Sequence, residues 1–100
     1  MEDVVISSAV RTPTGGFQGD LDGFSASELG GMAIEGAMEK AEIDRVDEVI
    51  MGNVLGAGQG QAPARQASFA AGLDETVPAT TLNKMCGSGM KAAMIGFDQI

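Results

Sequence analysis

The 100-residue sequence contains no histidine, tryptophan or tyrosine, and its only cysteine is Cys86. Without His and with one Cys it has few of the ligands that zinc and similar metals prefer, so we expect no metal site. One thiol cannot form an internal disulfide. Cys86 is therefore either a buried small side chain or a functional nucleophile.

Basic residues are also scarce, with 6 Lys and Arg against 14 Asp and Glu and a formal net charge of −8. The summed negative field repels polyanions, so we expect neither nucleic acid nor an anionic membrane as a partner. No apolar run approaches the roughly 20 residues that span a bilayer. The opening Met1-Glu2-Asp3 lacks the basic start of a secretory signal, and we expect a cytoplasmic protein.

Apolar runs that fit strands alternate with segments of helical periodicity. We expect strands at residues 4–10, 46–55 and 79–84. Ser25 and Glu28 form a capping-box pattern that predicts the start of a helix. Pro63 is well placed to open a second helix, which Gly72 would end in a left-handed conformation.

The remaining segments are a loop and a last helix. Gly and Asp residues punctuate residues 14–23, which we expect to form a loop ordered around Phe17 and Leu21. The last helix follows residues 85–89, and its apolar stripe consists of Met90, Ala93, Met94 and Phe97. Residues 98–100 contain no Gly, Asn or Pro stop signal, so we expect the last helix to continue and the natural polypeptide to be longer.

The alternation of strands and helices predicts an α/β fold. Parallel strands need crossover connections, and helices in those connections cover the faces of the sheet. We therefore expect one domain with a mostly parallel sheet and helices on both faces.

Cys86 follows a predicted strand directly and stands at the start of a predicted helix. The unpaired N–H groups and the dipole of a helix N-terminus favour negative charge, so a thiolate there would be stabilised. Gly87 and Gly89 allow a sharp turn and leave room for a bulky thioester. Ser88 is a weaker candidate, because a G-x-S-x-G nucleophile elbow would need glycine at Cys86 and Met90.

The Gly-rich segment 56–61 lies between a predicted strand and a predicted helix, as a dinucleotide-binding turn would. The G-x-G-x-x-G pattern fails, however, because its last glycine falls on Gln61 when begun at Gly56 and on Pro63 when begun at Gly58. A structural role for this turn is the better prediction.

Three segments, in order along the chain, carry a resemblance to a known family. Residues 83–92, Asn-Lys-Met-Cys-Gly-Ser-Gly-Met-Lys-Ala, are similar to the segment around the acylated cysteine of thiolases. Residues 5–13 resemble the first strand and its Arg-Thr-Pro exit, and residues 49–66 resemble the second strand and the following turn. The resemblance implies that residues 1–100 form the incomplete N-terminal part of the first βαβαβα half of a larger αβαβα layered enzyme.

The resemblance also implies a chemistry. Cys86 would attack an acyl-CoA to form an acyl-cysteine intermediate, and a second acyl-CoA enolate (Claisen condensation) or free CoA (thiolysis) would accept the acyl group. Gly87, Ser88 and Gly89 would support the turn, and Met85 is a candidate for lining the acyl pocket. Coenzyme A thioesters would be substrates rather than cofactors, no metal would be used, and the protein would be a homodimer or homotetramer of fatty acid metabolism.

One departure from the family pattern is important. Thiolases also use histidines and a second cysteine as base, acid and oxyanion donors, and this sequence contains none of them. Residues 1–100 alone are therefore expected to be inactive. Two alternatives stay open: another condensing enzyme of the superfamily, such as a ketoacyl synthase, and a non-catalytic thiolase-like carrier of acyl-CoA or lipid.

Overall fold

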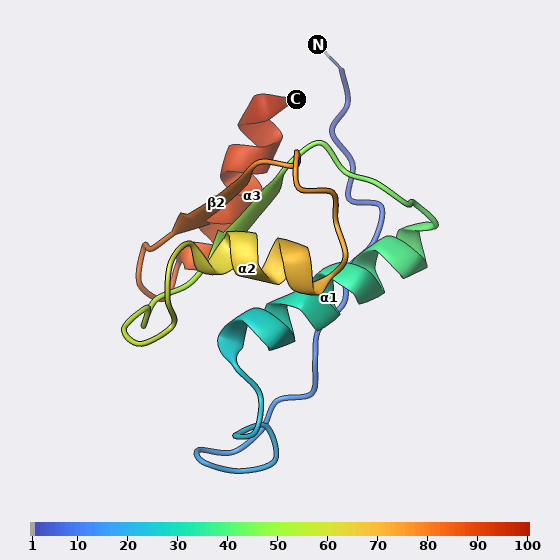
Figure 1. Ribbon diagram of the computed structural model, residues 1–100. Coiled ribbons are helices and arrows are strands. Elements are labelled where there is room, and N and C mark those ends of the chain that lie inside the picture. Colours follow the sequence, from blue (N-terminus) through green and yellow to red (C-terminus); the bar gives the residue numbers. More distant parts are fainter. Residues whose placement is uncertain (1) are drawn as a thin grey trace.

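The computed structural model describes residues 2–100, which form three helices and two strands (Figure 1). In chain order these are α1 (Ala26–Ala41), β1 (Val49–Gly52), α2 (Pro63–Ala70), β2 (Ala79–Leu82) and α3 (Ser88–Gln99). The two strands pair in parallel, with Val49 opposite Ala79 and Gly52 opposite Leu82. Helix α2 connects the two strands, so β1, α2 and β2 form a βαβ unit. The predicted α/β fold with a parallel sheet is confirmed.

Helices cover both faces of this small sheet. The Met51 side chain reaches α1, since its Cε lies 3.3 Å from the position that a Cβ would occupy at Gly30. The next residue, Gly52, faces the first turn of α3 at Ser88. Successive residues of a strand point to opposite faces. Helices α1 and α2 therefore lie on one face and α3 on the other, as predicted.

Helix α1 begins as the sequence predicts and crosses α2 closely. The Ser25 hydroxyl accepts the Glu28 N–H at 3.1 Å, and the Glu28 carboxylate accepts the Ser25 N–H at 3.1 Å, which completes the capping box. Gly31 is buried where the two helices cross, and a Cβ there would lie 2.7 Å from the Cβ of Ala70. The absence of a side chain at Gly31 thus sets the distance between α1 and α2.

The connection from α2 to β2 is fastened by Arg65. Its guanidinium lies 4.6 Å from the centre of the Phe69 ring and donates hydrogen bonds to the carbonyls of Glu75 (2.8 Å) and Val77 (3.1 Å). Gly72 follows the helix with φ +80°, the left-handed conformation that the sequence predicted.

The predicted strand at residues 4–10 is wrong, because this segment pairs with no other strand of residues 2–100. Its contacts go to α1 instead: the Ser8 hydroxyl donates to the Ala37 carbonyl at 2.7 Å, and the Lys40 ammonium donates to the Ala9 carbonyl at 3.2 Å. An open groove of about 690 Å³ separates residues 7–10 from β1. A run of branched apolar residues is typical of a strand, but a strand forms only where the edge of another strand is close enough for backbone hydrogen bonds.

Two apolar features predicted to be interior are exposed. Phe17 does not order its loop, since the side chain is 95% exposed. On α3 the buried residues are Ser88 and Ala92, while the predicted stripe that includes Met90 and Phe97 faces solvent. The small residues of α3 allow close contact with β1, so the helix packs on that side.

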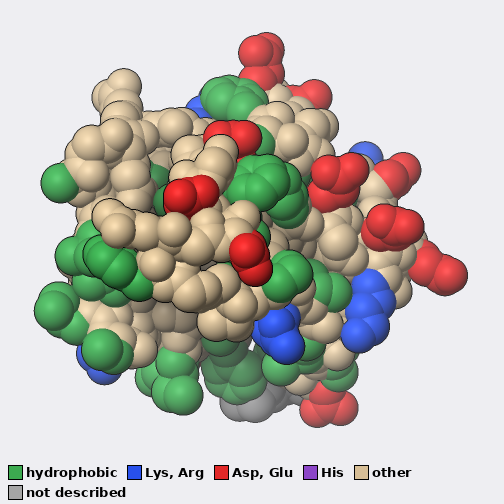
Figure 2. All heavy atoms as spheres, turned by 90° about the horizontal axis from the view of Figure 1, so that it is seen from below, with side chains coloured by type: hydrophobic (Ala, Val, Ile, Leu, Met, Phe, Trp, Pro, Cys, Tyr) green, Lys and Arg blue, Asp and Glu red, His purple; other side chains and the backbone are tan. Residues whose placement is uncertain are grey.

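The last features of the fold are the charge of its surface and the length of its helices. Acidic side chains outnumber basic ones on the face seen from below (Figure 2). None of the helices in the described part of the chain is both long and apolar enough to cross a membrane.

The packing at Gly31 gives the first testable prediction. Gly31→Ala should lower the free energy of unfolding by about 1–3 kcal/mol, because the added methyl overlaps Ala70 where two backbones meet. In the same helix, the methyl group added by Gly36→Ala would meet only Val10 Cγ2, at 3.7 Å. This variant should raise the free energy of unfolding by about 0.5–1 kcal/mol, because alanine has the higher helix propensity. Urea unfolding of both variants measures the difference, and equal effects would contradict the close crossing.

Candidate active site

Cys86 lies in the turn between β2 and α3, with its side chain exposed. It stands two residues before Ser88, the first residue of α3, and Gly87 is the N-cap residue. The sequence predicted this order of strand, turn and helix. The strand ends two residues earlier than predicted, at Leu82, because the chain then turns sharply.

The turn depends on an unusual backbone conformation at Met85, whose φ is +49°. A left-handed conformation costs roughly 1–2 kcal/mol for a residue with a side chain, so it must be held by its surroundings. Two backbone bonds contribute: the Gly87 N–H donates to the Lys84 carbonyl at 3.0 Å, and the Ser88 N–H donates to the Met85 carbonyl at 3.1 Å. Met85, which directly precedes Cys86, is 65% exposed.

Asn83 ties the turn to the exit of β1. Its side-chain oxygen accepts the Met85 N–H at 2.9 Å, and its amide donates to the Val54 carbonyl at 3.3 Å. One side chain therefore joins two segments that are 29 residues apart in the sequence. The sequence analysis noted Asn83 only as part of the cysteine segment, because its partner at Val54 is remote.

Ser88 holds the turn from the other side. The residue is buried, with 4% of its surface exposed. Its hydroxyl donates to the Met85 carbonyl at 2.6 Å and accepts the Lys84 N–H at 2.8 Å. A serine nucleophile needs its proton directed at a base and its oxygen open to the substrate. Since neither condition holds for Ser88, Cys86 is the better candidate for the nucleophile.

Gly52, which the sequence analysis missed, places α3 against the sheet. A Cβ at Gly52 would lie 2.6 Å from Ser88 Cβ, 2.7 Å from Ser88 C and 2.9 Å from Gly89 N. No side chain fits into that space. The signal in the sequence is a glycine at the end of a strand, which often marks a close backbone approach.

The Gly-rich turn after β1 is fixed by amide side chains. The Asn53 amide donates to the Gln59 side-chain oxygen at 2.7 Å. The Gln66 amide donates to the carbonyls of Gln59 (2.8 Å) and Gln61 (2.7 Å). The polar groups of the turn thus find hydrogen-bond partners among neighbouring residues of the same chain. These contacts support the predicted structural role of the turn.

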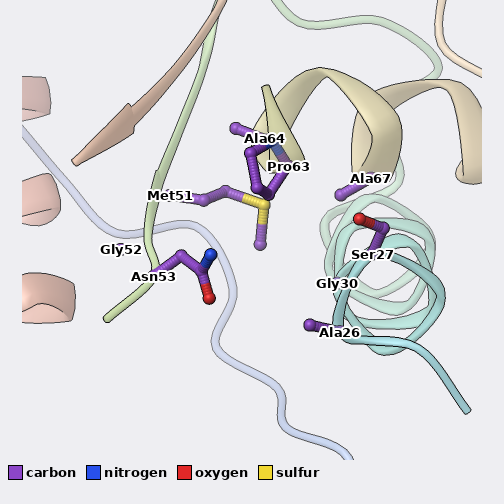
Figure 3. Close-up of a pocket in the computed structure, with 9 residues that line it drawn as sticks. All are labelled: Ala26, Ser27, Gly30, Met51, Gly52, Asn53, Pro63, Ala64 and Ala67. Atoms are coloured by element: carbon purple, nitrogen blue, oxygen red, sulfur yellow. The ribbon is translucent and has the colours of Figure 1, made fainter. Parts of the chain in front are cut away.

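A small cavity lies between α1, β1 and α2, on the opposite face of the sheet from α3 (Figure 3). Its volume is about 50 Å³, and Met51 points from β1 towards the two helices beside it. Pockets for small ligands typically measure about 300–1,000 Å³. This cavity is too small for a thioester, and Cys86 does not line it.

Comparison with known proteins decides the family. Residues 4–100 match the family described as "Thiolase, N-terminal domain". The chain belongs to the thiolase family. Its resemblance to thiolases in three segments is thereby confirmed.

Relatives and a solved structure agree with this assignment. The chain is 57% identical over 97 residues to acetyl-CoA acetyltransferase, mitochondrial, of Xenopus tropicalis, and 55% identical over 102 residues to acetyl-CoA acetyltransferase of Pseudomonas aeruginosa. These matches cover 95% and 100% of this chain but 23% and 26% of the relatives, so the chain spans about a quarter of their length.

Among solved structures, Acat5 thiolase from Ascaris suum in complex with coenzyme A matches with a TM-score of 0.92 and 41% identity. The match covers 95% of this chain and 25% of that thiolase. The chain therefore has the fold of one part of a larger thiolase, as predicted.

The contact at Gly52 gives the second prediction. Gly52→Ala should lower the free energy of unfolding by about 1–3 kcal/mol, because the methyl group overlaps the backbone of Ser88 and Gly89. Gly96→Ala, in α3 itself, meets no atom within 4 Å and should not destabilise the protein. Urea unfolding measures both, and a Gly52→Ala variant as stable as the parent would show that α3 does not rest on β1 here.

Proposed function

We propose that the full-length protein is an acetyl-CoA C-acetyltransferase or a related 3-ketoacyl-CoA thiolase, with Cys86 as the acylated nucleophile. One observation carries the proposal: the only thiol of a thiolase N-terminal domain is exposed on a strand-to-helix turn that side chains hold from both sides. Relatives named acetyl-CoA acetyltransferase and a similar thiolase solved with coenzyme A support the same substrate class.

The proposed reaction has two halves. The Cys86 thiolate attacks the carbonyl carbon of an acyl-CoA, the C–S bond to CoA breaks, and CoA leaves as a thiolate that takes up a proton. In condensation, the acyl group then passes from Cys86 to the enolate carbon of a second acyl-CoA, which has lost a proton to a base outside residues 1–100. In thiolysis, Cys86 instead attacks the 3-keto carbon of a 3-ketoacyl-CoA, the C2–C3 bond breaks, and the released acyl-CoA enolate takes up a proton. The acyl group then passes from Cys86 to the sulfur of free CoA, which gives up its thiol proton. Either transfer frees the Cys86 thiolate for another cycle.

The surroundings of Cys86 suit the first half of the reaction, in which the thiolate attacks a thioester. Gly87 and Gly89 carry no side chains that would block a thioester, and a Cβ at Gly89 would meet no atom within 4 Å. Met85 is exposed and directly precedes Cys86 in the chain, and we propose that it lines an acyl-binding pocket in the full-length protein.

Proton transfer must come from elsewhere in the full-length protein. Residues 1–100 contain no His and no second Cys, so no group of this chain is suited to take a proton from an acetyl methyl near neutral pH. We propose that these residues alone are inactive. Turnover of acetoacetyl-CoA by purified residues 1–100 would contradict this.

The wider setting is also proposed. Coenzyme A thioesters are substrates, no metal or further cofactor is needed, and the protein is a homodimer or homotetramer of fatty acid metabolism in which the turn at residues 56–61 contributes to the subunit contact. The cytoplasmic location expected from the sequence stays a prediction. The relative from Xenopus tropicalis is named mitochondrial, whereas the relative from Pseudomonas aeruginosa is not.

Acylation of Cys86 gives the third prediction. After brief exposure to acetyl-CoA and an acid quench, peptide mass spectrometry of the full-length protein should find one acetyl group on the peptide that contains Cys86. Cys86→Ala should abolish this label, because the thiol is the attacking group. Binding of acetyl-CoA without a covalent label would favour the non-catalytic carrier, and a label on another residue would contradict the assignment of Cys86.

A further inference from the structure

Ser88 makes contacts that its own helix does not need. A serine near the start of a helix usually accepts a hydrogen bond from an N–H group of that helix. Here the N-cap residue is Gly87, without a side-chain cap, and the Ser88 hydroxyl is bonded to Lys84 and Met85, outside the helix. The hydroxyl therefore serves the turn that carries Cys86.

We propose that Ser88 is a positioning residue for Cys86, a role that rests on the proposed acylation of this thiol. The hydroxyl bonds the N–H of Lys84 and the carbonyl of Met85, the two residues that directly precede the nucleophile. Both groups belong to the stretch of backbone that includes the left-handed Met85. The two hydrogen bonds thus fix the backbone conformation of the residues directly before Cys86.

The sheet in turn fixes Ser88. Its Cβ fills the space that the missing side chain of Gly52 leaves, so the hydroxyl has a rigid base at the end of β1. Asn83 holds the opposite side of the turn through Met85 and Val54. A rigid strand is therefore connected to the nucleophile through Ser88, and small displacements of a reacting group have large effects on rate.

Loss of the hydroxyl should affect the chemistry and leave substrate binding intact. Ser88 is 4% exposed, so a bound thioester does not reach it. Without the hydroxyl, the Lys84 N–H loses its side-chain acceptor, and the Met85 carbonyl keeps only the backbone bond from residue 88. The Cys86 thiol would then spend less time in the orientation that attacks the thioester.

The test is single-turnover acylation of the full-length protein by acetyl-CoA. Ser88→Ala should lower the acylation rate constant by about 10- to 100-fold, while the acetyl-CoA concentration at half-maximal rate changes by less than about twofold. The matched control is Ser68→Ala, because Ser68 is also a buried helical serine, 1% exposed, on α2. That control should keep the parent rate constant, so a general effect of removing a buried hydroxyl is separated from positioning.

A second pair of variants, Met85→Gly with and without Ser88→Ala, tests the link through Met85. Glycine adopts the left-handed conformation without steric cost, so it needs the Ser88 hydroxyl less. The factor by which Ser88→Ala lowers the acylation rate constant should therefore be smaller in a Met85→Gly background than in the parent. Equal losses in both backgrounds would overturn the conformational link.

The outcomes separate the two proposals. If the parent protein is acylated on Cys86 and Ser88→Ala is acylated equally fast, the positioning role is wrong and the proposed function stands. If the two variants at Ser88 and Ser68 lose the same fraction of rate, the effect is general and positioning is again wrong. If the parent itself is not acylated on Cys86, the proposed function fails and the positioning role falls with it.

Discussion

The backbone of β1 at Gly52 and the first turn of α3 approach so closely that no side chain fits between them. This contact fixes where α3 begins relative to the sheet, and the chain leaving β2 must turn sharply to reach that point. The left-handed Met85 is the product of this constraint, because five residues separate the end of β2 from Ser88. The turn places Cys86 at the surface beside the helix N-terminus.

The sequence predicted those parts of the fold that depend on near neighbours in the chain. The capping box at Ser25 and the helix start at Pro63 rest on local chemistry, and both are found where expected. The strand at residues 4–10 and the role of Phe17 in ordering its loop were predicted wrongly, since each depends on whether a remote partner lies within reach. The local sequence pattern predicts which secondary structure a segment favours, and tertiary contacts decide whether the segment adopts it.

The candidate site divides in the same way. The position of Cys86 between a strand and a helix follows from adjacent residues, and the nucleophile role proposed for it rests on the resemblance to thiolases. The bonds that hold the turn were not predicted, because Asn83 reaches Val54 across 29 positions and Gly52 meets Ser88 only in the folded chain. A glycine at a strand end and a serine directly after Cys86-Gly87 were the available signals.

The central claim is that a rigid turn presents the Cys86 thiol for acylation while the Ser88 hydroxyl remains internally bonded. The most direct measurement is a crystal structure of the full-length protein after exposure to acetyl-CoA. The account predicts acetyl density on the Cys86 sulfur, with Met85 still at positive φ and the Ser88 hydroxyl bonded to Lys84 and Met85. Acetyl density on another residue, or a Cys86 sulfur buried within a helix or strand and closed to solvent, would contradict it.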